Sequence, residues 1–292
     1  MGFVFGISSA FFFASTSVLV RIGQRRRSGD DGVLMTVFIN VIVLGAAAIF
    51  ATKPPWDTAG VLALLLGGIV GSVGGRSFNL RAVRLIGPSR ASAFITGTPL
   101  AAAIIGWFAL DESLTPIEAL GGILVIGGLL WLVRVRAGAR GILAGERVPL
   151  SSYMIAAAAP LFFGTAFVIR KWGLQQFDSS VVGAFLGSSA AFTVLTSIDA
   201  ARGRIRERIT MNIRPIPWWF VAAGVTASLA LLSQYTAFGY LPAWVVGILQ
   251  ATQGLWAIGL GLVFLKGDEK VDSALIGSVL LVISGVVLIA VQ

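Results

Sequence analysis

Hydrophobic residues in this chain form long continuous runs, and polar residues gather in the short segments between them. The runs lack the strict apolar–polar alternation of a β-barrel strand, and each has about the 20 residues that a helix needs to cross a lipid bilayer. The predicted spans cover residues 3–20, 32–51, 58–77, 88–109, 116–133, 151–169, 179–198, 217–238, 243–265 and 273–291. The pattern therefore predicts an all-α membrane protein with ten transmembrane helices.

The two halves of the chain share several landmarks in the same order. Residues 12–15 (Phe-Phe-Ala-Ser) correspond to residues 162–165 (Phe-Phe-Gly-Thr) at an offset of 150, and residues 98–100 (Thr-Pro-Leu) correspond to residues 253–255 (Gln-Gly-Leu) at an offset of 155. Chance similarity between apolar runs explains this shared order less well than a repeat does. Since each half holds an odd number of spans, the second half enters the membrane from the opposite side. The sequence predicts two inverted five-helix repeats, 1–133 and 151–292, joined by a basic linker, 134–150.

Local signals mark helix ends and close contacts. Thr115 and Glu118 have the spacing of a capping box, with proline at the first helical position. Pro99 and Pro160 lie inside predicted spans, where each frees a backbone carbonyl and favours a kink. Close helix packing is predicted at the regularly spaced glycines Gly67, Gly71, Gly75, Gly183 and Gly187.

Charge is scarce and unevenly placed. The 292 residues are 57% hydrophobic and 12% charged, about half the charged share of a soluble protein. Of the 22 Lys and Arg residues, 19 fall in odd-numbered connections, whereas Lys53, Arg170 and Lys171 are assigned to even-numbered ones. The positive-inside rule then places the odd-numbered connections in the cytosol and both termini outside. The net charge of +9 thus indicates membrane topology and contact with anionic membrane lipid, and no nucleic-acid partner is expected.

Several kinds of chemistry are excluded by what the chain lacks. It has no cysteine and no histidine, so it has no disulfide, thiol nucleophile, histidine zinc ligand or catalytic imidazole. All 13 acidic residues fall in connections or at helix ends, which argues against proton-coupled export of a cation, against paired catalytic carboxylates and against an acidic magnesium site. We therefore expect no cofactor, no metal site and no enzymatic activity.

Uncharged polar residues do occur at depth in the predicted spans, where an amide or hydroxyl is costly unless it is partnered or wetted. Two interpretations stay open: a cavity lined by substrate-binding side chains, and hydrogen bonds that hold helices together. Arg76 is either an anchor for an anion or a side chain that reaches the lipid headgroups. The candidates for substrate binding are Arg76, Asn79, Thr96, Thr98, Gln234, Tyr235, Gln250 and Gln253.

A family resemblance covers essentially the whole chain. It rests on Arg81-Ala82, residues 98–100, the acidic turn 111–114 (Asp-Glu-Ser-Leu) and the glycines from Gly121 to Gly128. In these motifs the chain resembles ten-helix members of the drug/metabolite transporter superfamily with two EamA-type repeats. The resemblance implies alternating access around a central cavity walled by the first, third, fourth, sixth, eighth and ninth helices. A weaker copy of the motifs runs through Gln253-Gly254-Leu255, Asp268-Glu269, Gly277 and Gly285.

These observations lead to one main hypothesis. The chain is expected to be a multi-pass protein of the cell membrane and a secondary transporter of a small polar metabolite, with an anion as one class that fits. Relatives tend to place both termini in the cytosol, which differs from the orientation that the charges indicate. A membrane enzyme acting on lipid-linked substrates and a non-transporting membrane scaffold are the alternatives. The substrate itself and the oligomeric state are not predicted.

Overall fold

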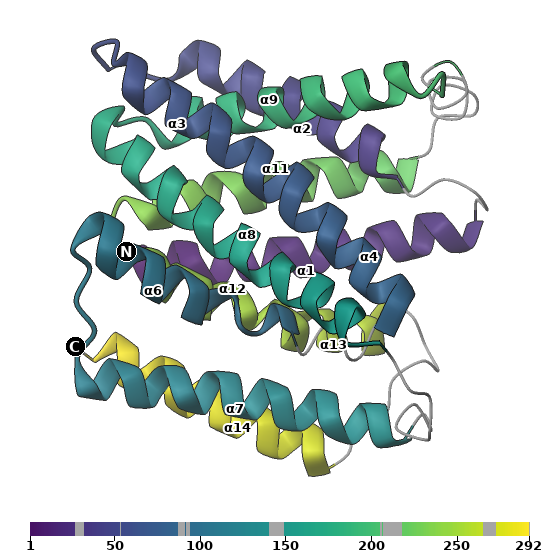
Figure 1. Ribbon diagram of the computed structural model, residues 1–292, viewed down its shortest axis with the longest axis vertical. Coiled ribbons are helices and arrows are strands. Elements are labelled where there is room, and N and C mark those ends of the chain that lie inside the picture. Colours follow the sequence, from purple (N-terminus) through teal and green to yellow (C-terminus); the bar gives the residue numbers. More distant parts are fainter. Residues whose placement is uncertain are drawn as a thin grey trace. The chain divides into compact units, whose positions relative to one another are not determined.

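The computed structural model describes residues 1–26, 32–52, 54–86, 91, 94–139, 149–204, 206, 218–264 and 273–291 (Figure 1). Within these ranges the regular elements are helices, and no strand occurs. The helices are α1 (Gly2–Arg26), α2 (Val33–Phe50), α3 (Thr58–Ile69), the π-helical segment η1 (Val70–Gly75), α4 (Arg76–Ile86), α6 (Thr98–Leu110), α7 (Pro116–Ala139), α8 (Leu150–Gln176), α9 (Ser180–Ala201), α11 (Trp218–Phe238), α12 (Ala243–Ala251), α13 (Gln253–Phe264) and α14 (Ser273–Ala290).

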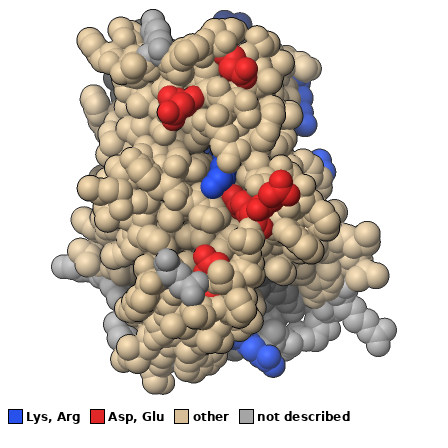
Figure 2. Space-filling view, turned by 90° about the vertical axis from the view of Figure 1, so that its left-hand side faces the viewer, with Lys and Arg blue, Asp and Glu red and all other residues tan. Residues whose placement is uncertain are grey.

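The surface and the lengths of these helices suit a lipid environment. Eight helical stretches among the described residues are long and apolar enough to cross a membrane, and two shorter apolar helices, Thr98–Leu110 and Ile276–Ala290, accompany them. Large apolar side chains such as Phe50 and Phe108 are exposed, and most of the surface seen in Figure 2 is uncharged. The predicted all-α membrane class is confirmed.

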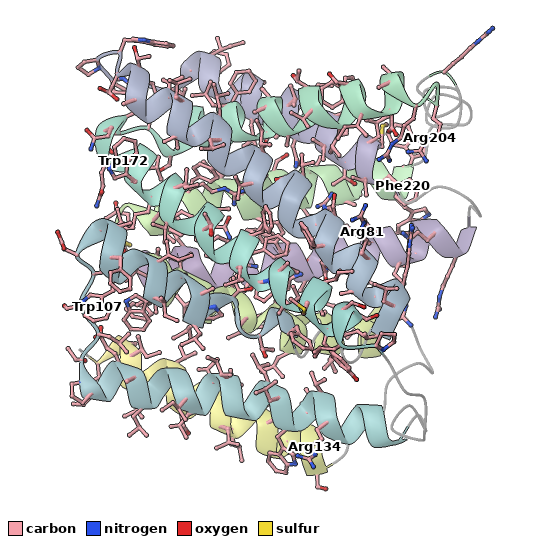
Figure 3. All side chains as sticks on the ribbon, in the orientation of Figure 1. Arg81, Trp107, Arg134, Trp172, Arg204 and Phe220 are labelled. Atoms are coloured by element: carbon pink, nitrogen blue, oxygen red, sulfur yellow. The ribbon has the colours of Figure 1, made fainter. Side chains whose placement is uncertain are left out.

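The helices form two compact units, which are described one at a time. The first unit contains α1, α2, α3, the end of α8, α9, α11 and most of α13. In it α11 packs on α1, α2 and α9, and α9 also packs on α2 and α3. Phe220 is fully buried against Gly23 and Gly32, where a Cβ would collide with its ring. Arg204 and Trp172 lie at opposite ends of this unit's helices (Figure 3).

The second unit contains η1, α4, α6, α7, the start of α8, α12 and α14. Its helices α7 and α14 run side by side (Figure 1) and approach closely, because a Cβ on Gly285 would lie 2.5 Å from the carbonyl oxygen of Gly121. The hydroxyl of Ser278 donates to the carbonyl oxygen of Gly128 at 2.8 Å across the same pair. Trp107 and Arg134 lie at opposite ends of the unit (Figure 3).

Some local predictions are confirmed and others are wrong. The capping box is confirmed, since the N–H of Thr115 donates to Oε2 of Glu118 at 2.8 Å and the N–H of Glu118 donates to the hydroxyl of Thr115 at 3.3 Å. Pro160 lies inside α8, as predicted. Pro99 does not lie inside a helix but in the first turn of α6, and the third span continues as far as Ile86 through η1 and α4.

Candidate functional site

Arg170 and Lys171 lie inside α8, so the assignment of both to an even-numbered connection is wrong. Arg170 is the buried one of the two. Arg170 stands six residues, or about 9 Å along the axis, before the last residue of that helix. The side chain is 5% exposed. Its Nε donates to the carbonyl oxygen of Gly67 at 3.2 Å, and its Nη1 donates to Oε1 of Gln234 at 3.1 Å. The guanidinium carbon lies 5.5 Å from the ring centroid of Tyr235. We call Gly67, Arg170, Gln234 and Tyr235, all in the first unit, the Arg170 cluster.

Glycines allow the helices around Arg170 to come together. A Cβ on Gly67 would lie 2.7 Å from Cγ of Arg170, so the absence of a side chain in α3 leaves room for the arginine stem. A Cβ on Gly187 of α9 would lie 2.5 Å from Oη of Tyr235, and one on Gly68 would overlap the backbone of Gly187. The close packing predicted at Gly67 and Gly187 is confirmed, and it surrounds a buried charge.

The guanidinium of Arg170 is only partly used by its neighbours. Arginine carries five N–H donors, and two of them have acceptors among the described residues, both of which are uncharged. No carboxylate in the described part of the chain pairs with Arg170, whereas Arg204 pairs with Asp199 at 3.2 Å. In the described part of the chain, the fully buried side-chain polar atoms without a hydrogen-bond partner are Ser188 Oγ, Ser189 Oγ and Trp244 Nε1. Nη2 of Arg170 has no acceptor there and is not among them, so this atom keeps some accessible surface.

A second polar region begins where the fourth span is interrupted. Pro99 has no N–H with which to bond the carbonyl of Ile95, four residues earlier. The hydroxyl of Thr98 replaces that donor, at 2.8 Å from the carbonyl oxygen of Ile95. The N–H of Gly97 donates to the carbonyl oxygen of Phe94 at 2.9 Å and closes a turn. Helix α6 therefore starts at Thr98, within the predicted span.

The ninth span is interrupted at the corresponding position. Thr252 separates α12 from α13, and its N–H and hydroxyl both donate to the carbonyl oxygen of Leu249, at 3.2 and 2.6 Å. At the repeat offset of 155, the first residues of α6 and α13, Thr98 and Gln253, match each other. Gly254, a weak helix former, follows Gln253 where a proline follows Thr98 in the first repeat. The fourth helix of each repeat is therefore interrupted at a matching position.

Two polar side chains at the second break bond to each other. Nε2 of Gln250 donates to Oε1 of Gln253 at 3.1 Å, across the break. Helices α6 and α12 pack on each other, with Gly247 so close to Pro99 that a Cβ would lie 3.2 Å from its Cα. We call Thr98, Gln250, Thr252 and Gln253, all in the second unit, the helix-break residues.

The eight predicted binding residues are divided between the two units. Gln234 and Tyr235 belong to the first unit, where Arg170 brings them together. The other six, Arg76, Asn79, Thr96, Thr98, Gln250 and Gln253, belong to the second unit. Arg76 and Asn79 are half-buried in the first turn of α4, directly after the π-helical segment. One site shared by all eight residues stays a prediction.

The acidic turn has a role that sequence reasoning missed. Both carboxylate oxygens of Glu112 accept from the N–H of Ala243, at 2.8 and 3.1 Å, so Glu112 caps the N-terminus of α12. A Cβ on Gly106 would lie 2.7 Å from this carboxylate, and Asp111 turns the chain with a φ of 52°. Across the described residues, no three acidic side chains gather into a group that is able to hold a metal ion.

The sequence matches the EamA-like transporter family over two segments, residues 1–134 and 150–291. The chain belongs to the EamA-like transporter family. Its two matched segments agree with a pair of inverted repeats, and the apolar helices make this EamA-like protein a multi-pass membrane protein. The family is one of transporters. A comparison with curated proteins gives no match.

The fold of this EamA-like chain also occurs among solved structures. One crystal structure, described only as that of a protein, superposes with a TM-score of 0.73 at 18% sequence identity. The superposition covers 99% of this chain and 96% of the other. At this identity the likeness shows the fold alone.

Arg170 is the residue of the candidate site in this EamA-like chain that the sequence-based prediction missed. It sits beside Lys171 at the end of an apolar run, and such a pair is typical of a helix end. One signal was available: at the offset of 150, Arg170 matches the apolar Val20, whereas Lys171 matches Arg21. A charge without a counterpart in the other repeat therefore marked the position.

Proposed function

We propose that this protein is a secondary transporter, not an enzyme, and carries a small polar metabolite, neutral or anionic, across the cell membrane by alternating access. The observation that carries the proposal is the pair of interruptions before Thr98 and Gln253. Secondary transporters commonly build their substrate sites from helices that are interrupted at matching positions of two inverted repeats. Membership of a transporter family supports the same function.

The preference for a neutral or anionic substrate follows from where the acidic residues lie. The six acidic residues of the described part all lie in connections or in the end turns of helices: Asp57, Asp111, Glu112, Glu118, Asp178 and Asp199. A transporter that exports cations in exchange for protons normally holds a carboxylate inside the membrane. The proposed substrate is therefore one that hydroxyl, amide or guanidinium groups recognise.

The orientation proposed for this transporter follows the distribution of basic residues. The sequence assigns 19 of the 22 Lys and Arg residues to odd-numbered connections, and the structure places some of them, such as Arg25 and Arg84, in the last turns of helices. On this distribution the positive-inside rule puts both termini outside the cytosol. A reporter fused after Gln292 that is active only in the cytosol is expected to be silent. Cytosolic activity of that fusion contradicts the orientation and leaves the transport function standing.

Uptake into proteoliposomes tests the proposed function. The full chain is reconstituted and offered radiolabelled amino acids, organic acids, sugars and sugar phosphates, with empty liposomes as the control. Saturable uptake of at least one compound, accelerated when the same compound is loaded inside, is the expected result. Absence of uptake across the whole panel by folded protein contradicts transport, and formation of a lipid product would support a membrane enzyme instead.

A further inference from the structure

We propose that the Arg170 cluster is the binding site for an oxyanion group of the substrate, a carboxylate or a phosphate. This inference rests on the proposed transport function and narrows its substrate to the anionic class. The cluster is distinct from the helix-break residues, which carried the argument for transport. It includes the predicted binding residues Gln234 and Tyr235 but not Arg76, the residue that the sequence offered as an anion anchor.

The first argument is the uncompensated charge. Arg170 is buried in a membrane-spanning helix, and its acceptors, the carbonyl of Gly67 and the amide oxygen of Gln234, are neutral. No described carboxylate pairs with it. An ionisable residue held inside a membrane protein is costly and is most often found where a ligand or a coupling ion binds. A bound anion would neutralise the charge that the fold leaves.

The second argument is the fixed orientation of the guanidinium. Hydrogen bonds at Nε and Nη1 define its plane, and the ring of Tyr235 lies 5.5 Å from its centre. The three N–H groups without acceptors among the described residues include both on Nη2, which is not sealed from its surroundings. A planar guanidinium that keeps adjacent donors matches the two oxygens of a carboxylate or a phosphate.

A competing explanation, called the fastening role below, is that Arg170 only stabilises the packing of α3, α8 and α11 through its hydrogen bonds. Its bonds reach Gly67 in α3 and Gln234 in α11, so loss of the side chain lowers stability under either explanation. Stability of the unliganded protein therefore does not separate the two. A response to anions does, because a fastening role gives no reason for oxyanions to bind.

Binding is measured on the purified full chain as the shift of its melting temperature with sodium acetate, succinate, phosphate or sulfate. Chloride at equal ionic strength and glycerol serve as controls. At least one oxyanion is expected to raise the melting temperature beyond the chloride control. A response to acetate or succinate alone identifies a carboxylate site, and a response to phosphate identifies a phosphate site. No response to any of the four contradicts the inference.

Two substitutions of Arg170 and a matched control link that response to the cluster. Arg170→Met is expected to weaken oxyanion binding at least about tenfold, because a hydrogen-bonded charge is lost. Arg170→Lys is expected to retain weaker binding, since a point charge replaces the planar fork. Lys171→Met, which removes the same charge from the next residue of α8, is expected to bind as the wild type does. Equal losses in Arg170→Met and Lys171→Met contradict the proposed site.

Gln234→Glu separates the anion site from the fastening role even if Arg170→Met does not fold. The new carboxylate still accepts from Nη1 of Arg170, so the helices stay joined, but it also neutralises the guanidinium. An anion site predicts that the oxyanion response falls about tenfold or more in a folded protein. A fastening role predicts no change in that response, which would overturn the inference.

The two levels of the proposal fail separately. Proteoliposomes that take up neutral metabolites, with uptake of every oxyanion absent, leave transport intact and contradict the anion site. If no compound of either kind is taken up by folded protein, transport itself is contradicted. Uptake of an oxyanion that Gln234→Glu abolishes, with Lys171→Met unaffected, supports both.

Discussion

The Arg170 cluster and the helix-break residues solve the same physical problem in different ways. Both place polar groups inside membrane-spanning helices, where a group without a partner is costly. At the breaks, the hydroxyls of Thr98 and Thr252 donate to carbonyls three residues earlier in the chain. In the cluster, Arg170 joins groups that lie 103 and 64 residues away along the chain.

The two regions differ in whether their hydrogen-bond partners lie near or far along the sequence. A break is largely satisfied by its own few residues, so its geometry follows from a proline or glycine and a neighbouring hydroxyl. The cluster exists only when α3, α8 and α11 have packed, and it retains donors after packing. The printed bonds of the breaks are therefore local, whereas the cluster keeps charged donors that no described neighbour uses.

The largest expected effect comes from the contact that brings α3 onto α9 beside the cluster. In Gly68→Val, the new side chain would collide with the backbone of Gly187, which has no flexible end to move aside. We expect a loss of at least about 3 kcal/mol in the free energy of unfolding, measured by denaturant titration in detergent. Oxyanion binding should be lost with it, because the cluster depends on this packing.

A glycine without neighbours provides the control for that experiment. Apart from the neighbouring backbone of α7 itself, no atom of the described residues lies within 4 Å of a Cβ built on Gly127, so Gly127→Ala adds a methyl group in open space. Its stability is expected to stay within about 0.5 kcal/mol of the wild type or to rise, since alanine favours a helix. A large loss in Gly127→Ala as well would show that any added methyl group harms the helices, and the comparison would lose its basis.

A pair of identical substitutions compares the two regions directly. Gln234→Met removes an acceptor of the charged Arg170, and Gln250→Met removes the neutral amide bond to Gln253. Hydrogen bonds to charged groups contribute about 1.5–3 kcal/mol and neutral ones about 0.5–1.5 kcal/mol. We expect the larger loss of unfolding free energy for Gln234→Met. The reverse order would mean that the break, not the cluster, carries the stronger polar interaction.

Substitution of Thr98 tests whether a break is a local structure. Thr98→Val keeps the shape but leaves the carbonyl of Ile95 without its donor, at an expected cost of about 1 kcal/mol. Thr98→Ser restores the hydroxyl and is expected to recover most of the loss. A change of substrate preference in uptake assays of folded Thr98→Val would show that Thr98 also contacts the substrate, as the sequence predicts, and that the break is more than a local structure.

The ten spans and the pairing of repeats were predictable because both depend on properties that a sequence states directly. Apolar runs of membrane length and the repeated order of landmarks can be recognised in the sequence without knowing how the helices pack. The break before Thr98 was less visible, because Pro99 was read as a kink within one helix. Whether a proline bends a helix or starts a new one depends on the donor that replaces its missing N–H, here the hydroxyl beside it.

The candidate site was only partly predictable for a related reason. Gln234 and Tyr235 stood out as polar residues at depth, but Arg170 looked like a charge at a helix end. Its burial depends on Gly67, which lacks a Cβ, and on Gln234 across the unit. Neither neighbour is close in the sequence, so no local pattern separates a buried arginine from one that reaches the headgroups.

The smallest expected effect concerns Glu112, which holds the first N–H of α12 at the opposite end of that helix from the Thr252 break. Glu112→Gln keeps an oxygen that accepts from Ala243 but removes the charge that favours a helix N-terminus. We expect a loss of about 0.3–1 kcal/mol in unfolding free energy and a further loss in Glu112→Ala, which removes the acceptor as well. Because the cap bonds α12 and not the Arg170 cluster, the ratio of oxyanion to neutral uptake should not change. A changed ratio in folded Glu112→Gln would mean that the position of α12 controls recognition of the anion, and the two regions would then act as one site.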